Sequence, residues 1–535
     1  MASKPPKSKH FNFSLILLSI CFIFLTITYI KIVQKELQNT ISYSNIARNP
    51  EWFDVITGEV GAKNIKVGLV NMDEMLDELG TKAKLVVKVS FEKVGDDIGW
   101  QDLFPQSTDE SKGSNCPQIP MPRFEDFKEL DVIVAKVPCK GFKGMEPRNV
   151  LRLQVNLVAA NLLIKSSSRQ HRDVYVVFIG SCLPMWEIFK CDDLLWHGKG
   201  WRIYKPELNK IKQNLLMPVG TCQLAPPFAQ TGEEIWRRGQ SDNHTIPQSR
   251  EAYVTILHSS EAYVCGAIAL AQSIILSNST KELLLLADEH ISPKSLAALR
   301  LAGWKTKQIQ RIRSPFSQKD AYNEWNYSKL RAWQLQEYSK VLFIDSDFIV
   351  LKNLDHFFVY PQLSASLNDK HLFNSGLMLL EPSKCTFKTL MKKRLVVASY
   401  NGGDQGFLNE MFPWWHRLPD KLNYMKYFPG LTDDYIRRIP DDAYAVHYLG
   451  LKPWMCYRDY DCNWDQVVYR IFASDSANEK WWRIYDTLPK NLKEFCSLSP
   501  GMNARIRQCR DAAKNASFSD GHWKIKVKDP RSHAT

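Results

Sequence analysis

Two aspartates that follow a run of apolar residues are the strongest candidates for chemistry in this sequence. Asp345 and Asp347 come directly after residues 341–344 (VLFI), a pattern typical of a strand buried on both faces. Because side chains alternate along a strand, we expect both carboxylates to point the same way. Paired carboxylates can hold a divalent cation, which can neutralise a diphosphate leaving group.

A second Asp-x-Asp pair shows how little the spacing means alone. A chain of this size contains about two such pairs by chance. Asp459 and Asp461 lie in a polar stretch flanked by cysteines, with no apolar strand before them. We interpret this second pair as structural, so the preceding strand distinguishes the first.

The elements around Asp345 predict a mainly parallel sheet. Residues 253–257 (YVTIL) are typical of a strand, 258–260 of a turn, 261–276 of a helix and 283–286 of the next strand. Strands and helices in this order form α/β domains, in which ligands bind at the carboxyl ends of the strands. Functional side chains should therefore come just after apolar runs.

The whole chain predicts two α/β domains behind a membrane anchor. Residues 11–30 contain no charged side chain and are about long enough to cross a bilayer as a helix. A cleaved signal peptide is the alternative, but the run is long for one and no cleavage site follows. We predict a cytosolic tail (1–10), a transmembrane signal anchor (11–30), a stem (31–60), a lumenal α/β domain (61–225), a linker (226–250), a catalytic α/β domain (251–455) and a C-terminal extension (456–535).

The cysteines agree with a lumenal body. Of 12 cysteines, only Cys21 falls in the predicted anchor, and the other 11 would face an oxidising compartment. Their odd number leaves at least one thiol, and sequence alone does not decide the pairing. Pairs near in sequence are Cys182 with Cys191, Cys456 with Cys462, and Cys496 with Cys509.

The net charge of +13 does not indicate nucleic-acid binding. The basic residues are spread along the chain, and no basic helix or stripe stands out. A basic surface of this kind suits a protein that handles anionic nucleotide sugars.

Six motifs in one order resemble glycosyltransferase family 8, which includes glycogenin-like and bacterial galactosyltransferases. The resemblance covers residues 251–455 and implies a GT-A type, Rossmann-like catalytic domain that binds a nucleotide sugar. The order of six motifs is far more specific than any one of them. They are residues 253–263 (YVTILHSSEAY), 327–335 (YSKLRAWQL), 343–347 (FIDSD), 373–376 (FNSG) with 381–383 (EPS), 403–408 (GDQGFL) and 447–454 (HYLGLKPW).

The resemblance implies a metal site formed by Asp345, Asp347 and His447. Two carboxylates and an imidazole suit Mn²⁺ better than a pure Mg²⁺ site. A lone histidine is more often a core residue, but here Gly450 and Lys452 follow it. Since glycine permits close backbone approach and lysine supplies a point charge, we expect this turn to clamp the β-phosphate.

The resemblance also implies the donor-binding and reacting residues. Lys329 is expected to contact donor oxygens, and Asp404 and Gln405 to face the reacting sugar. Transfer with retention is implied, with Asp404 either stabilising positive charge or attacking the sugar in a double displacement. Asn401 stands where glycogenin-like members carry an acid, which suggests a changed sugar or acceptor contact. The expected nucleotide and sugar contacts are Leu257, Ser259, Tyr263, Ser346, Asn374 and Ser375.

Two of these roles have alternatives. The ring of Tyr263 suits stacking on uracil, but a core aromatic on a helix face is the other interpretation. Arg331, beside the Lys329 motif, is a candidate partner for a donor carboxylate through bidentate pairing.

The sequence is further similar to the plant branch of family 8 that substitutes xylan with glucuronic acid. The similarity lies in residues 258–274 (HSSEAYVCGAIALAQSI), the long domain before the catalytic unit and the C-terminal extension. It implies a UDP-glucuronate donor, a β-1,4-xylan acceptor and an α-1,2 branch. It also implies a single-pass type II protein of the Golgi membrane with a lumenal catalytic domain, working beside other wall-polymer synthesis enzymes.

Three alternatives remain at this stage. A family 8 transferase could use another UDP-sugar or acceptor, such as glucose, galactose or arabinose. A non-catalytic scaffold of a wall-polymer synthesis complex would keep the fold but lose turnover. A glycoside hydrolase needs carboxylates separated across the scissile bond, whereas Asp345 and Asp347 share one strand end.

Overall fold

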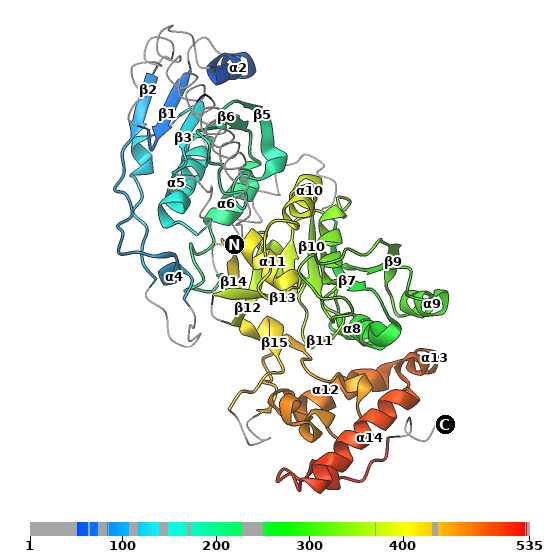
Figure 1. Cartoon of the computed structure of the whole chain (residues 1–535). Helices are drawn as coiled ribbons and strands as arrows, with labels where there is room; N and C mark the ends of the chain where they lie inside the picture. The colour runs from blue at the N-terminus through cyan, green and yellow to red at the C-terminus, as the bar shows by residue number, and fades with distance from the viewer. Residues whose placement is uncertain are drawn as a thin grey trace, which may run out of the picture.

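The computed structural model has three parts along its length: an N-terminal domain, a central domain and a C-terminal group of helices (Figure 1). Within the described residues, no helix is both long and apolar enough to cross a membrane. The predicted anchor (11–30) and nearly all of the predicted linker (226–250) lie outside them. The structure describes residues 31, 51–61, 65–72, 83, 85–105, 116–127, 129–138, 148–167, 173–226, 250–369, 371–430, 437–529 and 531.

The N-terminal domain is built on a six-stranded sheet of order β2-β1-β3-β4-β6-β5. The first four strands in this order pair in parallel, and β6 and β5 are antiparallel additions. This architecture agrees with the α/β class that the apolar runs predict. The elements are β1 (Lys66–Val70), β2 (Leu85–Val89), α4 (Trp100–Leu103), β3 (Val132–Lys136), α5 (Val150–Ser167), β4 (Tyr175–Ile179), β5 (Leu194–Gly198), β6 (Trp201–Tyr204) and α6 (Leu208–Leu215).

Helix α2 (Glu51–Val60) moves the start of the folded domain into the range assigned to the stem. Its Trp52, Phe53 and Ile56 are buried and belong to one hydrophobic cluster with strand residues of the six-stranded sheet. These three residues share one helix face, which is too short a pattern to stand out in the sequence. The N-terminal domain therefore includes residues 51–60, which precede the predicted boundary at residue 61.

The central domain contains a seven-stranded sheet of order β14-β12-β13-β10-β7-β8-β9. Strands β10, β7, β8 and β9 are parallel, as predicted, while β13 runs antiparallel to both β10 and β12. The strands are β7 (Glu251–Leu257), β8 (Glu282–Ala287), β9 (Lys305–Gln308), β10 (Lys340–Ile344), β12 (Ser364–Asp369), β13 (Leu372–Leu380) and β14 (His416–Leu418), and the helices are α8 (Val264–Leu276), α9 (Pro293–Leu301), α10 (Lys384–Lys393) and α11 (Asp404–Met411).

A small sheet beside β10 connects distant parts of the central domain. Its order is β11-β16-β15, and its strands are β11 (Phe348–Val350), β16 (Ala445–His447) and β15 (Tyr424–Met425). In the antiparallel pairing of β11 and β16, Phe348 lies opposite His447. The chain thus turns after β10 and continues into β11. There it pairs with β16, which carries His447 from a distant part of the sequence.

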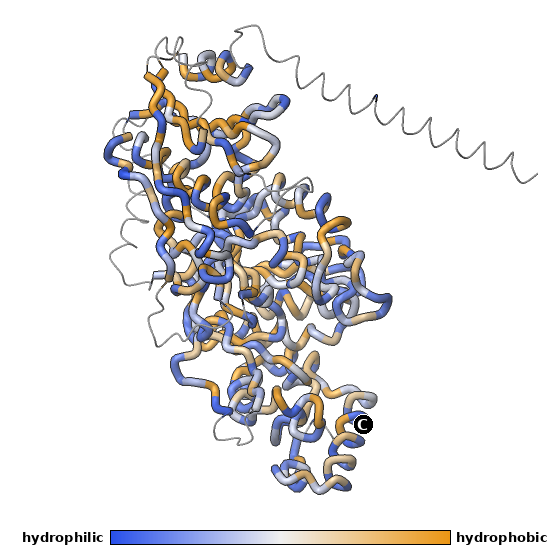
Figure 2. The backbone as a smooth tube through the Cα atoms, turned by 60° about the vertical axis from the view of Figure 1, so that its left-hand side comes forward, coloured by the Kyte–Doolittle hydropathy of each residue, from blue (hydrophilic) through white to orange (hydrophobic). Residues whose placement is uncertain are grey.

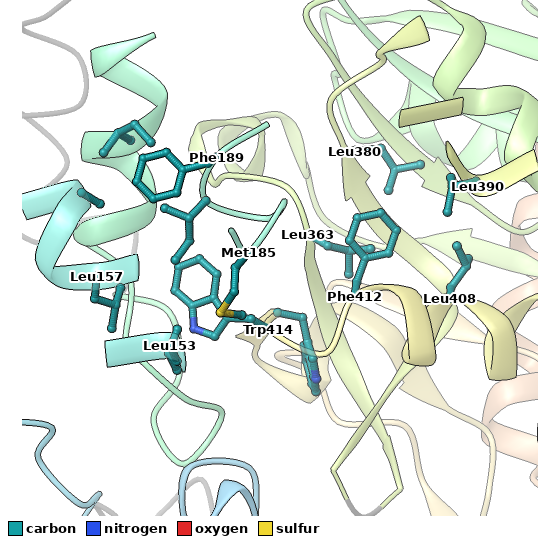
Figure 3. Close-up of a cluster of buried hydrophobic side chains, with 14 of the residues drawn as sticks. Leu153, Leu157, Met185, Phe189, Leu363, Leu380, Leu390, Leu408, Phe412 and Trp414 are labelled. Carbon is teal, nitrogen blue, oxygen red and sulfur yellow. The ribbon is translucent and has the colours of Figure 1, made fainter. Parts of the chain in front are cut away.

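The N-terminal and central domains share one hydrophobic core. Figure 3 shows Leu153, Leu157, Met185 and Phe189 facing Trp414 and Phe412 across the junction. Helix α5 belongs in this junction because its Leu153 and Leu157 lie in this shared core, and most of its residues are buried. Figure 2 shows long hydrophobic stretches in the N-terminal domain and hydrophilic residues mainly along the outer turns.

Polar contacts and a disulfide reinforce the same junction. The ring of Trp186 stacks on Phe412, with centroids 4.6 Å apart. Arg148 binds both carboxylate oxygens of Glu410, and Cys191 is bonded to Cys385. The two domains therefore form one continuous body.

The C-terminal extension packs on the central domain through helix α12 (Asp475–Thr487), whose Trp481 and Trp482 are buried in the same cluster as α8. A disulfide from Cys265 to Cys496 links it to α8. Two short-range pairings considered from the sequence are wrong, because Cys191 and Cys496 bond to distant partners. The third, Cys456 with Cys462, is confirmed, and Cys509 is a free thiol. The other C-terminal helices are α13 (Lys490–Lys493) and α14 (Pro500–Asn515).

Candidate active site

The structure brings Asp345, Asp347 and His447 together at the carboxyl end of β10. One ligand atom from each lies within 4.8 Å of the others. The Nε2 atom of His447 is 3.5 Å from Oδ1 of Asp347, and its ring stacks on Phe348. The motif that follows β10 and the motif at the end of β16 thus form one site.

This group fits a divalent cation. The donors are two carboxylates and an imidazole, and Nδ1 of His447 is buried without a hydrogen-bond partner. Gly376 on β13 leaves the space that the imidazole fills, because a Cβ there would lie 2.7 Å from Cε1 of His447. The three ligands are therefore held by packing before any ion binds.

Two buried lysines neutralise the carboxylates from opposite ends of the cluster. Nζ of Lys329 is 2.9 Å from Oδ2 of Asp345 and 3.1 Å from Oδ2 of Asp404. Nζ of Lys452 is 2.7 Å from Oδ2 of Asp347 and also donates to the carbonyl of Tyr448. Both lysines were predicted as donor contacts, and both lie beside the candidate metal ligands.

The cluster still carries an excess of negative charge, since three carboxylates meet two ammonium groups. Burial raises the pKa of Asp345 to about 6, although Lys329 opposes the shift. Burial alone would also raise the pKa of Asp347, but Lys452 and His447 bring it below its usual range. Such a site attracts a cation and, once the cation is present, an anionic diphosphate.

The turn that carries Lys452 depends on Gly450. Its φ is +74°, a conformation that favours glycine, and a Cβ there would lie 2.5 Å from Oδ1 of Asn463. That same oxygen accepts a hydrogen bond from the backbone N–H of Leu451. The predicted close-packed turn is thus present, and it directs Lys452 toward Asp347.

Asp404 and Gln405 lie beside the lysine on the other side of the cluster. Asp404 begins α11, is buried and accepts a 2.7 Å hydrogen bond from Oγ of Ser375. Oε1 of Gln405 accepts from the backbone N–H of Ser375. The predicted pair is therefore held by β13, next to Lys329.

Asn374 is fully engaged within the protein. Its Oδ1 accepts from the backbone N–H of Gly376 and from Asn423, and its Nδ2 donates to Asn368 and contacts Sδ of Met425. These contacts fix the strand that supports Ser375 and Gly376. The predicted contact of Asn374 with the donor sugar stays a prediction.

The predicted nucleotide residues lie around the end of β7. Leu257 is buried at the last position of this strand, and Ser259 adopts a left-handed φ of +71°. The ring of Tyr263 meets Trp454 edge to face and lies 5.9 Å from Nζ of Lys452. Tyr263 is thus half-buried, packs against the core of the central domain and lies beside Lys452, so its stacking on uracil stays a prediction.

Ser346 lies between the two candidate metal-binding aspartates in a closely packed turn. A Cβ at Gly266 of α8 would lie 2.4 Å from the carbonyl oxygen of Ser346. The glycine therefore lets α8 approach the turn after β10 closely. This contact fixes the backbone that carries both aspartates.

Sequence reasoning missed a polar group next to Ser259. Asp288 follows β8 and accepts a 3.0 Å hydrogen bond from the backbone N–H of Ser259. Arg311 lies over the ring of Trp325 at 3.8 Å, with Nη1 3.4 Å from Oγ of Ser259. The rule that polar residues follow parallel strands would have found Asp288, whereas no local signal marks Arg311.

His258 completes this group as a neutral side chain. Its Nδ1 is 2.9 Å from Oγ of Ser259. Burial lowers the pKa of His258 to about 4, and Asp288 opposes this effect only in part.

Two other interpretations have clear structural outcomes. Arg331 bonds the carbonyl of Gln310 and the side chain of Gln334, so the structure does not place it among the site residues. Oδ1 of Asn401 accepts from the backbone N–H groups of Gly403 and Gly406 and thus shapes the loop before α11.

The second Asp-x-Asp pair is structural, as predicted. Asp461 is buried, forms an ion pair with Lys426 at 2.6 Å and accepts from the backbone N–H of Ser474. Asp459 accepts from the backbone N–H groups of Lys528 and Asp529. Both carboxylates are used to hold the C-terminal extension.

Comparison with known proteins agrees with this geometry. Residues 40–222 match the family model "GUX1-5 N-terminal domain", and residues 254–456 match "Glycosyl transferase family 8". The chain is 54% identical over 504 residues to the Arabidopsis thaliana protein named putative UDP-glucuronate:xylan alpha-glucuronosyltransferase 4, covering 91% of this chain and 89% of that protein.

Two further relatives differ in how much of their sequence matches this chain. UDP-glucuronate:xylan alpha-glucuronosyltransferase 2 of Arabidopsis thaliana is 47% identical over 484 residues, covering 88% of this chain and 81% of that protein. Human glycogenin-1 is 28% identical over 294 residues, covering 51% of this chain and 82% of that protein. The similarity to the Arabidopsis proteins thus extends over both domains.

Proposed function

The chain belongs to the family of UDP-glucuronate:xylan alpha-glucuronosyltransferases, which carries a family 8 glycosyl transferase domain, and we propose that it transfers glucuronic acid from UDP-glucuronate to the xylan backbone as an α-1,2 branch. The observation that carries this proposal is the complete cluster of Asp345, Asp347, His447, Lys329 and Lys452 at one strand end. A scaffold that had lost turnover would have no need to retain all five.

Asp345, Asp347 and His447 would hold the metal ion, and we propose Mn²⁺ because the set combines carboxylate oxygens with an imidazole. When bound, the ion supplies positive charge that stabilises the departing UDP. Lys452 adds a point charge at the same end of the cluster. Tyr263, beside Lys452, would stack on the uracil ring.

At the other end, Lys329 steadies donor oxygens while Asp404 and Ser375 fix its position. The acceptor hydroxyl would attack the anomeric carbon on the face that UDP leaves, which retains its configuration. Because the Asp404 carboxylate is paired with Lys329, we favour a role in stabilising positive charge over direct attack. A double displacement would instead leave a glycosyl adduct on Asp404 that can be trapped.

The proposed location is the Golgi membrane, with residues 11–30 as the anchor, the catalytic domain in the lumen and other wall-polymer synthesis enzymes as neighbours. Within the described part of the chain nine cysteines are disulfide-bonded, which is typical of proteins that fold in an oxidising compartment.

The test is a product assay with the purified full chain, Mn²⁺, xylo-oligosaccharides and UDP-glucuronate, UDP-glucose, UDP-galactose or UDP-arabinose as separate donors. The expected product is a xylo-oligosaccharide heavier by one glucuronosyl unit, detected by mass spectrometry. Products from another donor but none from UDP-glucuronate would overturn the donor assignment. Failure to modify xylo-oligosaccharides with any donor would overturn the acceptor.

A further inference from the structure

Three exposed aromatic residues lie on two loops next to Gln405. We define Phe316, Tyr322 and Tyr400 as the aromatic rim. Their exposed fractions are 40%, 86% and 56%, which is unusual for side chains that normally bury their rings. The rim therefore presents apolar surface to solvent close to the candidate active site.

The two loops that carry the rim are bound to each other. Nδ2 of Asn323 donates to the carbonyl of Asn401 at 2.6 Å, and Oγ of Ser314 donates to the carbonyl of Gly402 at 2.6 Å. Gly402 has a φ of +68°, and a Cβ there would lie 3.0 Å from the carbonyl oxygen of Phe316. The rim is thus held in place before a ligand binds.

Tyr400 connects the rim to the reacting residues. Its hydroxyl accepts a 2.9 Å hydrogen bond from Nε2 of Gln405, whose Oε1 accepts from the backbone N–H of Ser375. Burial raises the pKa of Tyr400, and the phenol of Tyr322 adds to this shift as a minor cause. The rim therefore lies at the Asp404 end of the cluster, whereas Tyr263 lies at the Lys452 end.

We propose that the aromatic rim is the platform on which the xylan acceptor binds, with the rings of Tyr322 and Tyr400 stacked on xylose units next to the one that reacts. This inference rests on the proposed function, since the family substitutes an uncharged chain of pyranose rings. Each such ring has a flat apolar face that buries well against an aromatic ring. The nucleotide end of the cluster has its own aromatic residue, so the rim is free for the acceptor.

The hydroxyl and the ring of Tyr400 have separable roles. The ring would bind the acceptor, while the hydroxyl positions Gln405. Replacing tyrosine by phenylalanine removes only the second of these. Tyr400→Phe should thus keep the acceptor KM and lower kcat, whereas Tyr400→Ala should raise the acceptor KM.

The test measures steady-state kinetics of the full chain with UDP-glucuronate and xylo-oligosaccharides of increasing length, together with direct binding of xylohexaose by titration calorimetry. Tyr322→Ala and Tyr400→Ala should each raise the acceptor KM by about tenfold for long acceptors, and weaken xylohexaose binding to match. Trp196→Ala is the matched control, because this half-exposed ring lies on β5 of the N-terminal domain.

Two results would overturn the rim as acceptor platform. One is an unchanged acceptor KM and xylohexaose affinity in both alanine variants. The other is an equal rise in KM for Tyr400→Phe and Tyr400→Ala, which would assign the effect to the hydroxyl. If the wild type transfers glucuronic acid and the variants give either result, only the role of the rim is contradicted. A wild-type protein that neither modifies nor binds xylo-oligosaccharides contradicts the proposed function as well.

Discussion

At the scale of single residues, the site is a chain of charge pairs, and we propose that one end binds the nucleotide and the other the sugar. Lys452 pairs with Asp347 and borders Tyr263, while Lys329 pairs with Asp345 and Asp404. Burial makes each pair sensitive to the loss of one partner, because the remaining charge is then unpaired in a poorly hydrated site.

Lys452→Met tests the phosphate clamp. Methionine keeps the length and apolar contacts of the side chain but removes the charge that offsets negative charge on departing UDP. We expect kcat to fall by about 10²- to 10³-fold, as for other charge-stabilising groups. Steady-state transfer assays measure the change. The control is Lys294→Met, since Lys294 is largely exposed on α9, and equal losses in both variants would refute the clamp.

The two aspartates of the candidate metal site could be predicted because a buried strand leaves a local pattern in the sequence. Asp288 obeys the same rule after β8 and was available to the same reasoning. Arg311 was not, because its place beside Ser259 depends on contact between segments 52 residues apart. The role of Asn401 in shaping its own loop likewise needed the backbone geometry.

At the scale of elements, three strands fix the metal site. β10 carries the aspartates, β16 carries His447, and β13 supplies Gly376 beneath the imidazole. The parallel order of β10, β7 and β8 could be predicted from alternating strand and helix patterns. The antiparallel β13 and the small sheet with β16 could not, because short or non-local strand pairings leave little periodicity in the sequence.

Gly376→Ala tests this arrangement without touching a ligand. The added Cβ would lie 2.7 Å from the imidazole of His447 and displace it. We expect metal affinity to fall by about 10- to 100-fold, as when groups that orient metal ligands are changed. Calorimetric titration with Mn²⁺ measures the loss.

Gly501→Ala is the matched control for Gly376→Ala, since nothing lies within 4 Å of a Cβ at Gly501. It should bind the metal like the wild type. Wild-type affinity in Gly376→Ala, with the fold intact by circular dichroism, would show that His447 is not a ligand.

At the scale of the whole molecule, the N-terminal domain is part of the catalytic body. Most residues of α5 are buried, and the central domain covers part of the helix. No pattern in the sequence indicates which part of the chain covers it. Contacts such as Arg148 with Glu410 join residues 262 positions apart. The activity of the central domain should therefore depend on the N-terminal domain.

Glu187 makes the junction sensitive to pH. Its side chain is buried near Arg152 and accepts from the backbone N–H of Trp414. Burial raises the pKa of Glu187 from 4.5 to about 7, so the folded state holds the proton more tightly than the unfolded state. This contribution to stability is full below pH 4.5 and is lost as pH rises through about 7, which amounts to about 3 kcal/mol.

Glu187→Gln should thus be more stable than the wild type at pH 8 and similar to it at pH 5. Urea unfolding at the two pH values measures the difference. Glu479→Gln, an exposed change on α12, should follow the wild type at both. A constant difference between Glu187→Gln and the wild type from pH 5 to pH 8 would exclude this linkage.

The central claim is that Asp345, Asp347 and His447 hold a metal ion that acts with UDP. Calorimetric titration of Mn²⁺ into the wild type and Asp347→Asn, each with and without UDP, tests it most directly. The account predicts one Mn²⁺ site in the wild type, tighter when UDP is present, and binding weakened by at least about 10-fold in the variant. Equal Mn²⁺ affinity in the two proteins would contradict it.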